Sequence, residues 1–181
     1  MEKIAFLGDS IRMGYAPRTM ELLGNGYEYI NPTDNCRFAK YTSRLIFDMR
    51  KSLAGSTVIH WNNGLWDICN LWGEGPFTPI DEYVSTMLWN AKKLLGMTKT
   101  LIFATTTPVR PENPYDHIEA IRAANAALVP ELEAIGVVIN DLHSVIARDI
   151  PGYICDDYIH LSPKGIEVAA AHNAAFIKKY L

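Results

Sequence analysis

Hydrophobic and polar positions along this chain of 181 residues follow two different periods. Short continuous apolar runs, which predict strands buried on both faces, occupy residues 3–7, 27–30, 57–61, 100–105 and 137–139. Apolar positions at helical spacing occupy residues 13–23, 40–52, 80–95, 118–135 and 163–179. Strands that alternate with helices predict a parallel sheet covered on both faces. We therefore expect one α/β domain over residues 1–181, a three-layer α/β/α sandwich around a five-stranded parallel sheet.

Polar residues follow several of the predicted strands, where a sheet of this kind binds its ligands. Ligands of open parallel sheets lie beyond the carboxyl ends of the strands, where the loops that lead into the helices gather. Asp157 and His160 lie in the loop before the last predicted helix and can reach the same edge. We therefore expect them to converge with the polar residues that come after strands, which are Ser10, Asn35, Asn62, Asn63 and residues 105–107.

Composition and charge exclude some classes of function. The hydrophobic share of 49% and the charged share of 20% are ordinary for a soluble globular protein. The net charge of −3 provides no electrostatic footprint for nucleic acid, so we expect no nucleic-acid partner. The chain has three cysteines, an odd number without metal-like spacing, which indicates free thiols in a reducing compartment.

The N-terminal residues and the hydropathy of the chain predict a cytoplasmic protein without a membrane partner. Met1 lies directly before the first predicted strand, without the apolar stretch and cleavage site of a signal peptide. No window approaches the roughly 18 consecutive apolar residues of a membrane span. A signal peptide that had been removed would leave the same pattern, and the sequence indicates no oligomeric state.

Two short motifs at opposite ends of the chain supply the groups that acyl transfer by a serine requires. An apolar run ends in Gly-Asp-Ser, so a buried strand delivers Ser10 to the first turn of a helix. Asp157-x-x-His160 places a carboxylate and an imidazole on one short loop. Nucleophile, base and orienting group are the three roles of such a site, in any chain order. We therefore predict Ser10 as nucleophile, His160 as base and Asp157 as the orienting carboxylate.

Each motif also has a purely structural interpretation. Asp9 and Ser10 belong to the residue types that commonly cap helices, and a cap needs no catalytic role. Asp157 and His160 also fit an ordinary polar loop before a helix start. Asp156 is a competing carboxylate beside Asp157. We favour the catalytic interpretation because the two motifs supply complementary roles.

The order of the motifs resembles that of the SGNH (GDSL-type) hydrolase superfamily, in its esterase/acylhydrolase branch. The similarity covers residues 6–161 and rests on Gly8-Asp9-Ser10, the asparagine-rich segment at residues 62–63 and Asp157-x-x-His160. It implies a flavodoxin-like three-layer α/β/α domain in which the serine is the nucleophile and the histidine the base. It also implies an oxyanion hole formed by the serine, a glycine and an asparagine, and a reaction without metal or organic cofactor.

The segment at residues 35–42 departs from the family at the oxyanion glycine. With Asn35 and Thr42 kept in the family register, Lys40 stands where the glycine is expected. A backbone N–H serves the hole, so this donor is retained, and the resemblance assigns the N–H groups of Ser10 and Lys40 to it. Three explanations of Lys40 remain open: a shifted register, a positive charge beside an anionic substrate, and a solvated lysine at a helix start.

The segment at residues 57–64 contains the candidate for the side-chain donor of the oxyanion hole. The resemblance places Asn62 on the oxyanion asparagine and His60 at a position usually held by glycine. A one-residue shift exchanges Asn62 for Asn63, and a plain turn is the structural alternative for Asn-Asn-Gly. The histidines without a comparable partner spacing, for which we expect structural or surface roles, are His60, His117, His143 and His172.

Trp61, Trp66 and Tyr158, together with Asp9, are the candidates for contact with a substrate. Aromatic walls suit sugars and short acyl chains, although a core or lid role is the alternative for each of them. No long apolar insertion indicates a deep acyl channel. We therefore expect a small-molecule ester as partner, and an esterase that removes a small acyl group, acetyl first, from a polar alcohol such as a carbohydrate.

Other activities remain alternatives. A lysophospholipase-like or thioesterase-like acylhydrolase would use the same residues on longer acyl chains. A catalytically weak binding module is consistent with Lys40 and His60 at usual glycine positions. A phosphotransferase would use Asp9 as its nucleophile, but the next residues lack a second aspartate. A dinucleotide-binding domain is disfavoured because no Gly-x-Gly-x-x-Gly follows a predicted strand.

Overall fold

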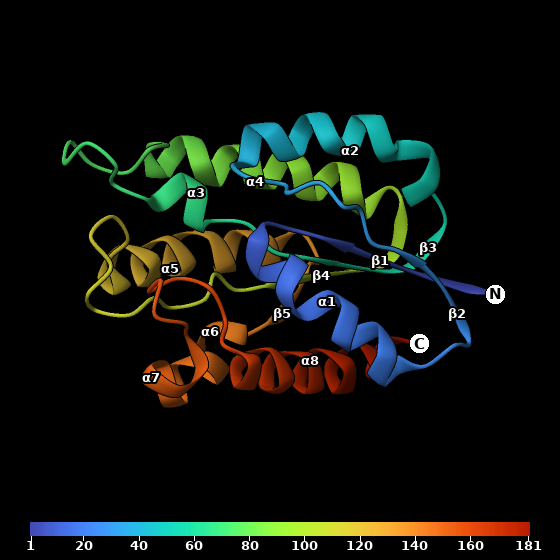
Figure 1. Cartoon of the computed structure of the whole chain (residues 1–181). Helices are drawn as coiled ribbons and strands as arrows, with labels where there is room; N and C mark the ends of the chain where they lie inside the picture. The colour runs from blue at the N-terminus through green and yellow to red at the C-terminus, as the bar shows by residue number, and fades with distance from the viewer.

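Five parallel strands form the middle layer of the computed structural model, which describes residues 1–181 (Figure 1). Their order in the sheet is β2-β1-β3-β4-β5, and every neighbouring pair is parallel. The strands are β1 (Glu2–Leu7), β2 (Tyr27–Ile30), β3 (Ser56–Trp61), β4 (Thr98–Ala104) and β5 (Val138–Asn140). The predicted three-layer fold with a five-stranded parallel sheet is confirmed.

Helices cover both faces of the sheet, as Figure 1 shows. On one face α1 (Ser10–Leu23) packs against α8 (Pro163–Ile177). On the other face α4 (Ile80–Leu95) packs between α2 (Ala39–Leu53) and α5 (Ile118–Ala134). None of the helices is long and apolar enough to span a membrane.

Four further helical segments have no counterpart among the predicted elements. They span three to five residues each, too few for an apolar period to be visible in the sequence. They are α3 (Leu65–Ile68), α6 (Leu142–Ile146), η1 (Ala147–Asp149) and α7 (Ile150–Tyr153). The helix predicted over residues 163–179 contains α8 and extends into η2 (Lys178–Tyr180). Helix α1 also begins three residues earlier than the periodicity predicted, because Asp9 caps it at Ser10.

The strand order creates one place where a ligand site is expected. The chain leaves β1 toward β2 on one side and leaves β3 toward β4 on the other, so the connections diverge between β1 and β3. Such a switch point opens a crevice at the carboxyl ends of the two strands. Leu7 pairs with Trp61 in this ladder, and the N–H of Asn62 donates to the carbonyl of Leu7 at 3.1 Å. The register therefore brings the ends of β1 and β3 together.

Candidate active site

Helix α1 presents Ser10 at the end of β1. The side chain of Asp9 caps the helix by accepting from the N–H of Ile11 at 3.0 Å. Ser10 is the first helical residue, so its own N–H belongs to the helix end that lacks intrahelical acceptors and attracts negative charge. Gly8 has a φ of 154°, and a Cβ there would lie 2.2 Å from Oδ1 of Asn62. Glycine at this position lets β3 approach the turn that carries Ser10.

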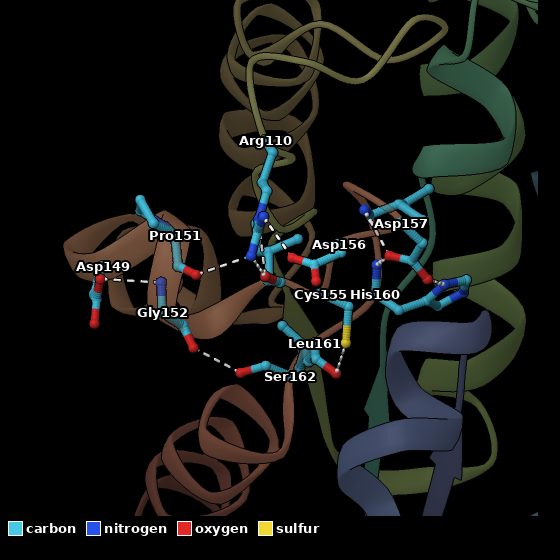
Figure 2. A network of polar contacts seen from close by, with 12 residues as sticks. Arg110, Asp149, Pro151, Gly152, Cys155, Asp156, Asp157, His160, Leu161 and Ser162 are labelled. Atoms are coloured by element: carbon cyan, nitrogen blue, oxygen red, sulfur yellow. Dashed lines mark hydrogen bonds and ion pairs between the residues drawn. The ribbon is translucent and has the colours of Figure 1, made fainter.

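Ser10, His160 and Asp157 form one continuous hydrogen-bonded row, although the first two are 150 positions apart. Nε2 of His160 lies 2.9 Å from Oγ of Ser10. Nδ1 of His160 lies 2.7 Å from Oδ2 of Asp157. Figure 2 shows Asp157 and His160 on the loop before α8, with the imidazole beside the start of α1. The structure thus brings together the three residues for which catalytic roles were predicted.

Asp157 is held by the backbone of its own loop. Its Oδ1 accepts from the N–H groups of Ile159 at 3.1 Å and His160 at 3.0 Å. Burial acts to raise the pKa of Asp157, but the hydrogen bonds from the backbone and side chain of His160 outweigh it and lower the pKa below its usual value. An ionised Asp157 accepts the Nδ1 proton of His160, which leaves Nε2 free to accept a proton from Ser10.

Arg110 holds the same loop in place, a role that was not predicted from the sequence. Its guanidinium donates to the carbonyls of Ile154 and Pro151, and to Oδ1 of Asp156 at 2.9 Å (Figure 2). Its backbone N–H donates to the carbonyl of Tyr158 at 2.9 Å. Asp156, the competing carboxylate, is therefore paired with Arg110 on the side away from the imidazole. The sequence signal that could have identified Arg110 is a single cation within the proline-rich loop of residues 108–114.

Asn62 lies behind the start of α1 with its amide held at both ends. Its Nδ2 donates to Oδ1 of Asp9 at 2.8 Å, and its Oδ1 accepts from the hydroxyl of Tyr15 at 2.9 Å. One Nδ2 proton remains for another acceptor, because an amide carries two. Asp9 is only 1% exposed, and burial raises its pKa against the lowering effect of the Asn62 hydrogen bond. The prediction that Asp9 contacts the substrate is corrected: Asp9 caps α1 and holds Asn62.

Asn63 is engaged elsewhere. Its Nδ2 donates to the carbonyl of Arg37 at 2.7 Å. Its Oδ1 accepts from Nε1 of Trp61 at 2.6 Å and from Oγ1 of Thr42 at 3.0 Å. These contacts fix the segment that leads into α2. Of the two asparagines, Asn62 is the one whose hydrogen bonds lie at the start of α1.

Lys40 lies in the first turn of α2 with its side chain directed away from this site. The ammonium pairs with Glu82 of α4, and the side chain is 66% exposed. The residue with a glycine-like backbone in this segment is Arg37, whose φ is +51°. The N–H of Arg37 donates to Oδ1 of Asn35 at 2.7 Å, so this residue has no free backbone donor for a shifted register. The Lys40 side chain matches the alternative of a solvated lysine at a helix start.

Two of the predicted aromatic residues lie at the surface and one does not. Trp61 has no exposed surface and packs edge-on against Phe103. The prediction that Trp61 lines the cleft is therefore wrong: because β3 is buried on both faces, this side chain belongs to the core. Trp66 and Tyr158 are 43% and 36% exposed.

A pocket of about 220 Å³ lies beside the loop that carries His160. Six of its seven lining residues are hydrophobic, and they come from α3, from the loop after it, from the loop before α5 and from the loop before α8. The polar exception is Asp116, which is 5% exposed. Its Oδ1 has no hydrogen-bond partner, and burial raises its pKa to about 6. The lining residues are Leu65, Trp66, Cys69, Leu71, Tyr115, Asp116 and Ile159.

Neither the cysteines nor clusters of potential metal ligands form a second candidate site. Cys36, Cys69 and Cys155 are free, and Cys36 is buried with its sulfur accepting from the N–H of Gly8 at 3.1 Å. No group of three or more histidine, cysteine, aspartate or glutamate side chains is placed to hold a metal ion.

The sequence matches no protein-family model and no curated protein sequence. Solved structures are similar over nearly the whole chain. A lipase/acylhydrolase from Enterococcus faecalis is 17% identical, with a TM-score of 0.80 over 99% of this chain and 96% of that one. The acetylxylan esterase Axe2 from Geobacillus stearothermophilus is 16% identical, with a TM-score of 0.78 over 97% and 94%. A GDSL-like lipase from Bacteroides thetaiotaomicron is 17% identical, with a TM-score of 0.76 over 99% and 89%.

The chain has the SGNH (GDSL-type) hydrolase fold. At these identities the likeness establishes the fold, as the resemblance of the motifs implied. Within an SGNH-type fold, the Gly8-Asp9-Ser10 turn follows β1 and the Asp157-x-x-His160 loop precedes α8.

Proposed function

We propose that this protein is a serine esterase that removes a small acyl group, acetyl first, from a polar alcohol such as a carbohydrate. The observation that carries the proposal is the unbroken row from Oγ of Ser10 through the imidazole of His160 to the carboxylate of Asp157. Such a row supplies the nucleophile, the base and the orienting group that ester hydrolysis by a serine enzyme requires. A role of Asp9 and Ser10 as a helix cap does not explain this arrangement.

In the acylation step, His160 removes the proton of Ser10 while Oγ attacks the carbonyl carbon of the ester. The carbonyl π bond opens, and its electron pair moves to the oxygen. His160 then gives the proton to the alcohol oxygen, the bond between the acyl carbon and that oxygen breaks, and the alcohol leaves. Asp157 stabilises the imidazolium that forms between these two transfers.

Hydrogen-bond donors near Ser10 are proposed to stabilise the negative charge on the carbonyl oxygen. They are the N–H of Ser10 at the start of α1 and the second Nδ2 proton of Asn62. Lys40 is proposed to contribute only through its backbone N–H, because its side chain pairs with Glu82. Losing one such side-chain donor in other enzymes lowers kcat by about 10²–10³-fold.

Deacylation repeats the sequence with water in place of the alcohol. His160 removes a proton from the water molecule, the hydroxide attacks the acyl-serine, and the bond to Oγ breaks as His160 returns the proton to Ser10. The products are a carboxylic acid and free enzyme. All of these proton transfers use Ser10 and His160, so the proposed reaction involves no metal or organic cofactor.

The pocket around Asp116 supports a polar alcohol as the leaving group. Trp66 and Tyr115 offer aromatic surface of the kind that packs against sugar rings, and Asp116 is the polar residue of the lining. Ile159 of the pocket directly precedes His160, and Leu65 and Trp66 follow Asn62 closely in the chain. Trp66 lines this pocket and is 43% exposed, so we expect Trp66→Ala to raise the KM for an acetylated sugar and to leave that for p-nitrophenyl acetate unchanged.

A longer acyl chain is the second candidate for this pocket, because six of its seven lining residues are hydrophobic. In that case the protein is a lysophospholipase-like or thioesterase-like acylhydrolase. A panel of p-nitrophenyl esters from acetyl to decanoyl, assayed beside acetylated sugars, separates the two candidates. Turnover confined to long chains contradicts the small-acyl proposal.

The esterase proposal itself is tested with p-nitrophenyl acetate and a fluorophosphonate probe. Wild-type protein is expected to hydrolyse the ester and to be labelled at Ser10, as located by mass spectrometry. Ser10→Ala should lose both properties. Ser85→Ala, which changes an exposed serine on α4, is the matched control and should retain both. Hydrolysis that continues unchanged in Ser10→Ala, or a protein that is never labelled, contradicts the proposal.

A further inference from the structure

A row of polar side chains crosses the core behind the proposed oxyanion site. Tyr15 of α1, His60 of β3, and Asn140 at the end of β5 all have no exposed surface. The row continues to Asn173 and the half-buried His172 on α8. Buried polar groups are costly unless they are hydrogen-bonded, and these belong to four separate elements. A local turn therefore does not explain them.

The direction of the hydrogen bonds can be assigned from Asp9 outward. Oδ1 of Asp9 accepts from the backbone N–H of Ile11, so the group of Asn62 that faces this oxygen at 2.8 Å is the NH₂ end. The carbonyl end of Asn62 then faces the hydroxyl of Tyr15 at 2.9 Å. Because the carbonyl can only accept, Tyr15 donates its proton to Asn62.

The same logic assigns the tautomer of His60. The oxygen of Tyr15 is left as an acceptor, and the group facing it is Nδ1 of His60 at a long 3.4 Å. On the other side of the ring, Nε2 faces Nδ2 of Asn140 at 3.2 Å, which is a donor. His60 therefore carries its proton on Nδ1 and accepts at Nε2. Burial lowers the pKa of His60 to about 3, which keeps the ring neutral.

The far end of the row agrees with this direction. Nδ2 of Asn140 also donates to Oδ1 of Asn173 at 2.8 Å, and Oδ1 of Asn140 faces Nε2 of His172 at 2.6 Å. Every contact from His172 to Asn62 can thus be written as a donor facing an acceptor. A reversed Asn62 amide would turn its carbonyl toward Oδ1 of Asp9, so that two acceptors would face each other at 2.8 Å.

We infer that Tyr15, oriented by His60, is a positioning residue that holds the Asn62 amide with its second Nδ2 proton available to the oxyanion at Ser10. This inference rests on the proposed esterase function and on the assignment of Asn62 within it. Preorganised donors stabilise the charge that develops in the transition state because they need no reorientation during the reaction. Tyr15 does not touch the substrate, so its effect must pass through Asn62.

A double-mutant cycle tests this coupling. Y15F removes only the hydroxyl, and we expect kcat to fall about tenfold with KM nearly unchanged, because the donor is misplaced rather than lost. In the Asn62→Ala background, Y15F should change kcat by less than about twofold. Y83F is the matched control, since Tyr83 is an equally buried tyrosine whose hydroxyl donates to the backbone carbonyl of Asn63. Equal losses in both backgrounds, or in Y15F and Y83F, overturn the inference.

A second measurement does not depend on turnover. In ¹⁵N-histidine NMR spectra, His60 should carry its proton on Nδ1, and a proton on Nε2 overturns the inference whatever the activity. An Nδ1 proton in a protein without Ser10-dependent hydrolysis contradicts the esterase proposal instead.

If Y15F does not fold, the variants H60N and H60Q are used in its place. An asparagine amide can occupy the Nδ1 position and donate to Tyr15, so H60N should retain more kcat than H60Q, and the reverse order overturns the inference.

Discussion

Asn62 and Asp157 both assist the proposed chemistry at Ser10, but they are held in opposite ways. Asn62 is 4% exposed and is fixed by Asp9 and Tyr15, side chains of another element. The side chain of Asp157 is 49% exposed and is fixed by the backbone of its own loop. The proposed oxyanion side of the site is therefore part of the core, whereas the proposed acid–base side is a loop attached to it. Substitutions on the two sides should separate stability from activity.

The largest expected effect is on the loop side. His160→Ala should lower kcat by about 10⁴-fold or more, because it removes the base, while the free energy of unfolding changes by less than about 1 kcal/mol. Asp157→Ala should behave similarly with a smaller loss. Asp156→Ala is the control, because its carboxylate pairs with Arg110. Steady-state kinetics and urea unfolding measure both quantities, and a loss in Asp156→Ala as large as in Asp157→Ala refutes the assignment.

On the core side we expect activity and stability to fall together. Asn62→Ala should lower kcat by about 10²-fold or more and the free energy of unfolding by about 2 kcal/mol, because Asp9 and Tyr15 lose a buried partner. Asn63→Ala should destabilise the protein to a similar degree, since Arg37 and Trp61 lose their partner, with a much smaller loss of kcat. If Asn63→Ala loses more kcat than Asn62→Ala, the two asparagines have been assigned in the wrong order.

Arg110 connects the two kinds of support, because it ties the exposed loop to the body of the protein. Arg110→Ala frees the carbonyls of Pro151 and Ile154 and should lower kcat about tenfold, since small misplacements of a catalytic group are costly. Arg122→Ala, which removes an exposed cation paired with Glu119, is the matched control. Steady-state kinetics compare the two variants. If kcat is the same in Arg110→Ala and Arg122→Ala, Arg110 does not help to position His160.

The smallest expected effect is on Asp116, and here the substitution should raise the free energy of unfolding instead of lowering it. Burial raises the pKa of Asp116 to about 6, so the folded state binds this proton more tightly than the unfolded state. The stabilising contribution is complete below about pH 4 and is lost as the pH rises through about 6. Asp116→Asn should therefore stabilise the protein at pH 7.5 and change its free energy of unfolding by nearly nothing at pH 4. Urea unfolding at both values measures this difference. A variant that is less stable at pH 7.5 shows that the carboxylate has a favourable partner.

Local patterns explain which parts of the molecule were predictable. The five strands are continuous apolar runs, and the Asp157–His160 pair is a spacing within one loop, so neighbouring residues carry both signals. The same holds for Asp9 as the cap of α1. The prediction that Trp61 lines the cleft failed because burial of a strand residue depends on which helices cover the sheet. Lys40 was assigned to the oxyanion position from the register of a motif. The backbone conformation of Arg37 in the same segment depends on a contact with Asn63, which no local register records.

The order of apolar runs and the two end motifs were enough to define an α/β sandwich with Ser10, His160 and Asp157 as candidates, because each is encoded by residues close together in the chain. Only the tertiary structure decided which asparagine stands behind α1, where Arg110 binds, and that Tyr15 and His60 lie in one row with Asn62. Tyr15 is 47 positions from Asn62 and 45 from His60, and Arg110 is 46 positions from Asp156. The geometry of these contacts follows from strand order and packing, which no local spacing records.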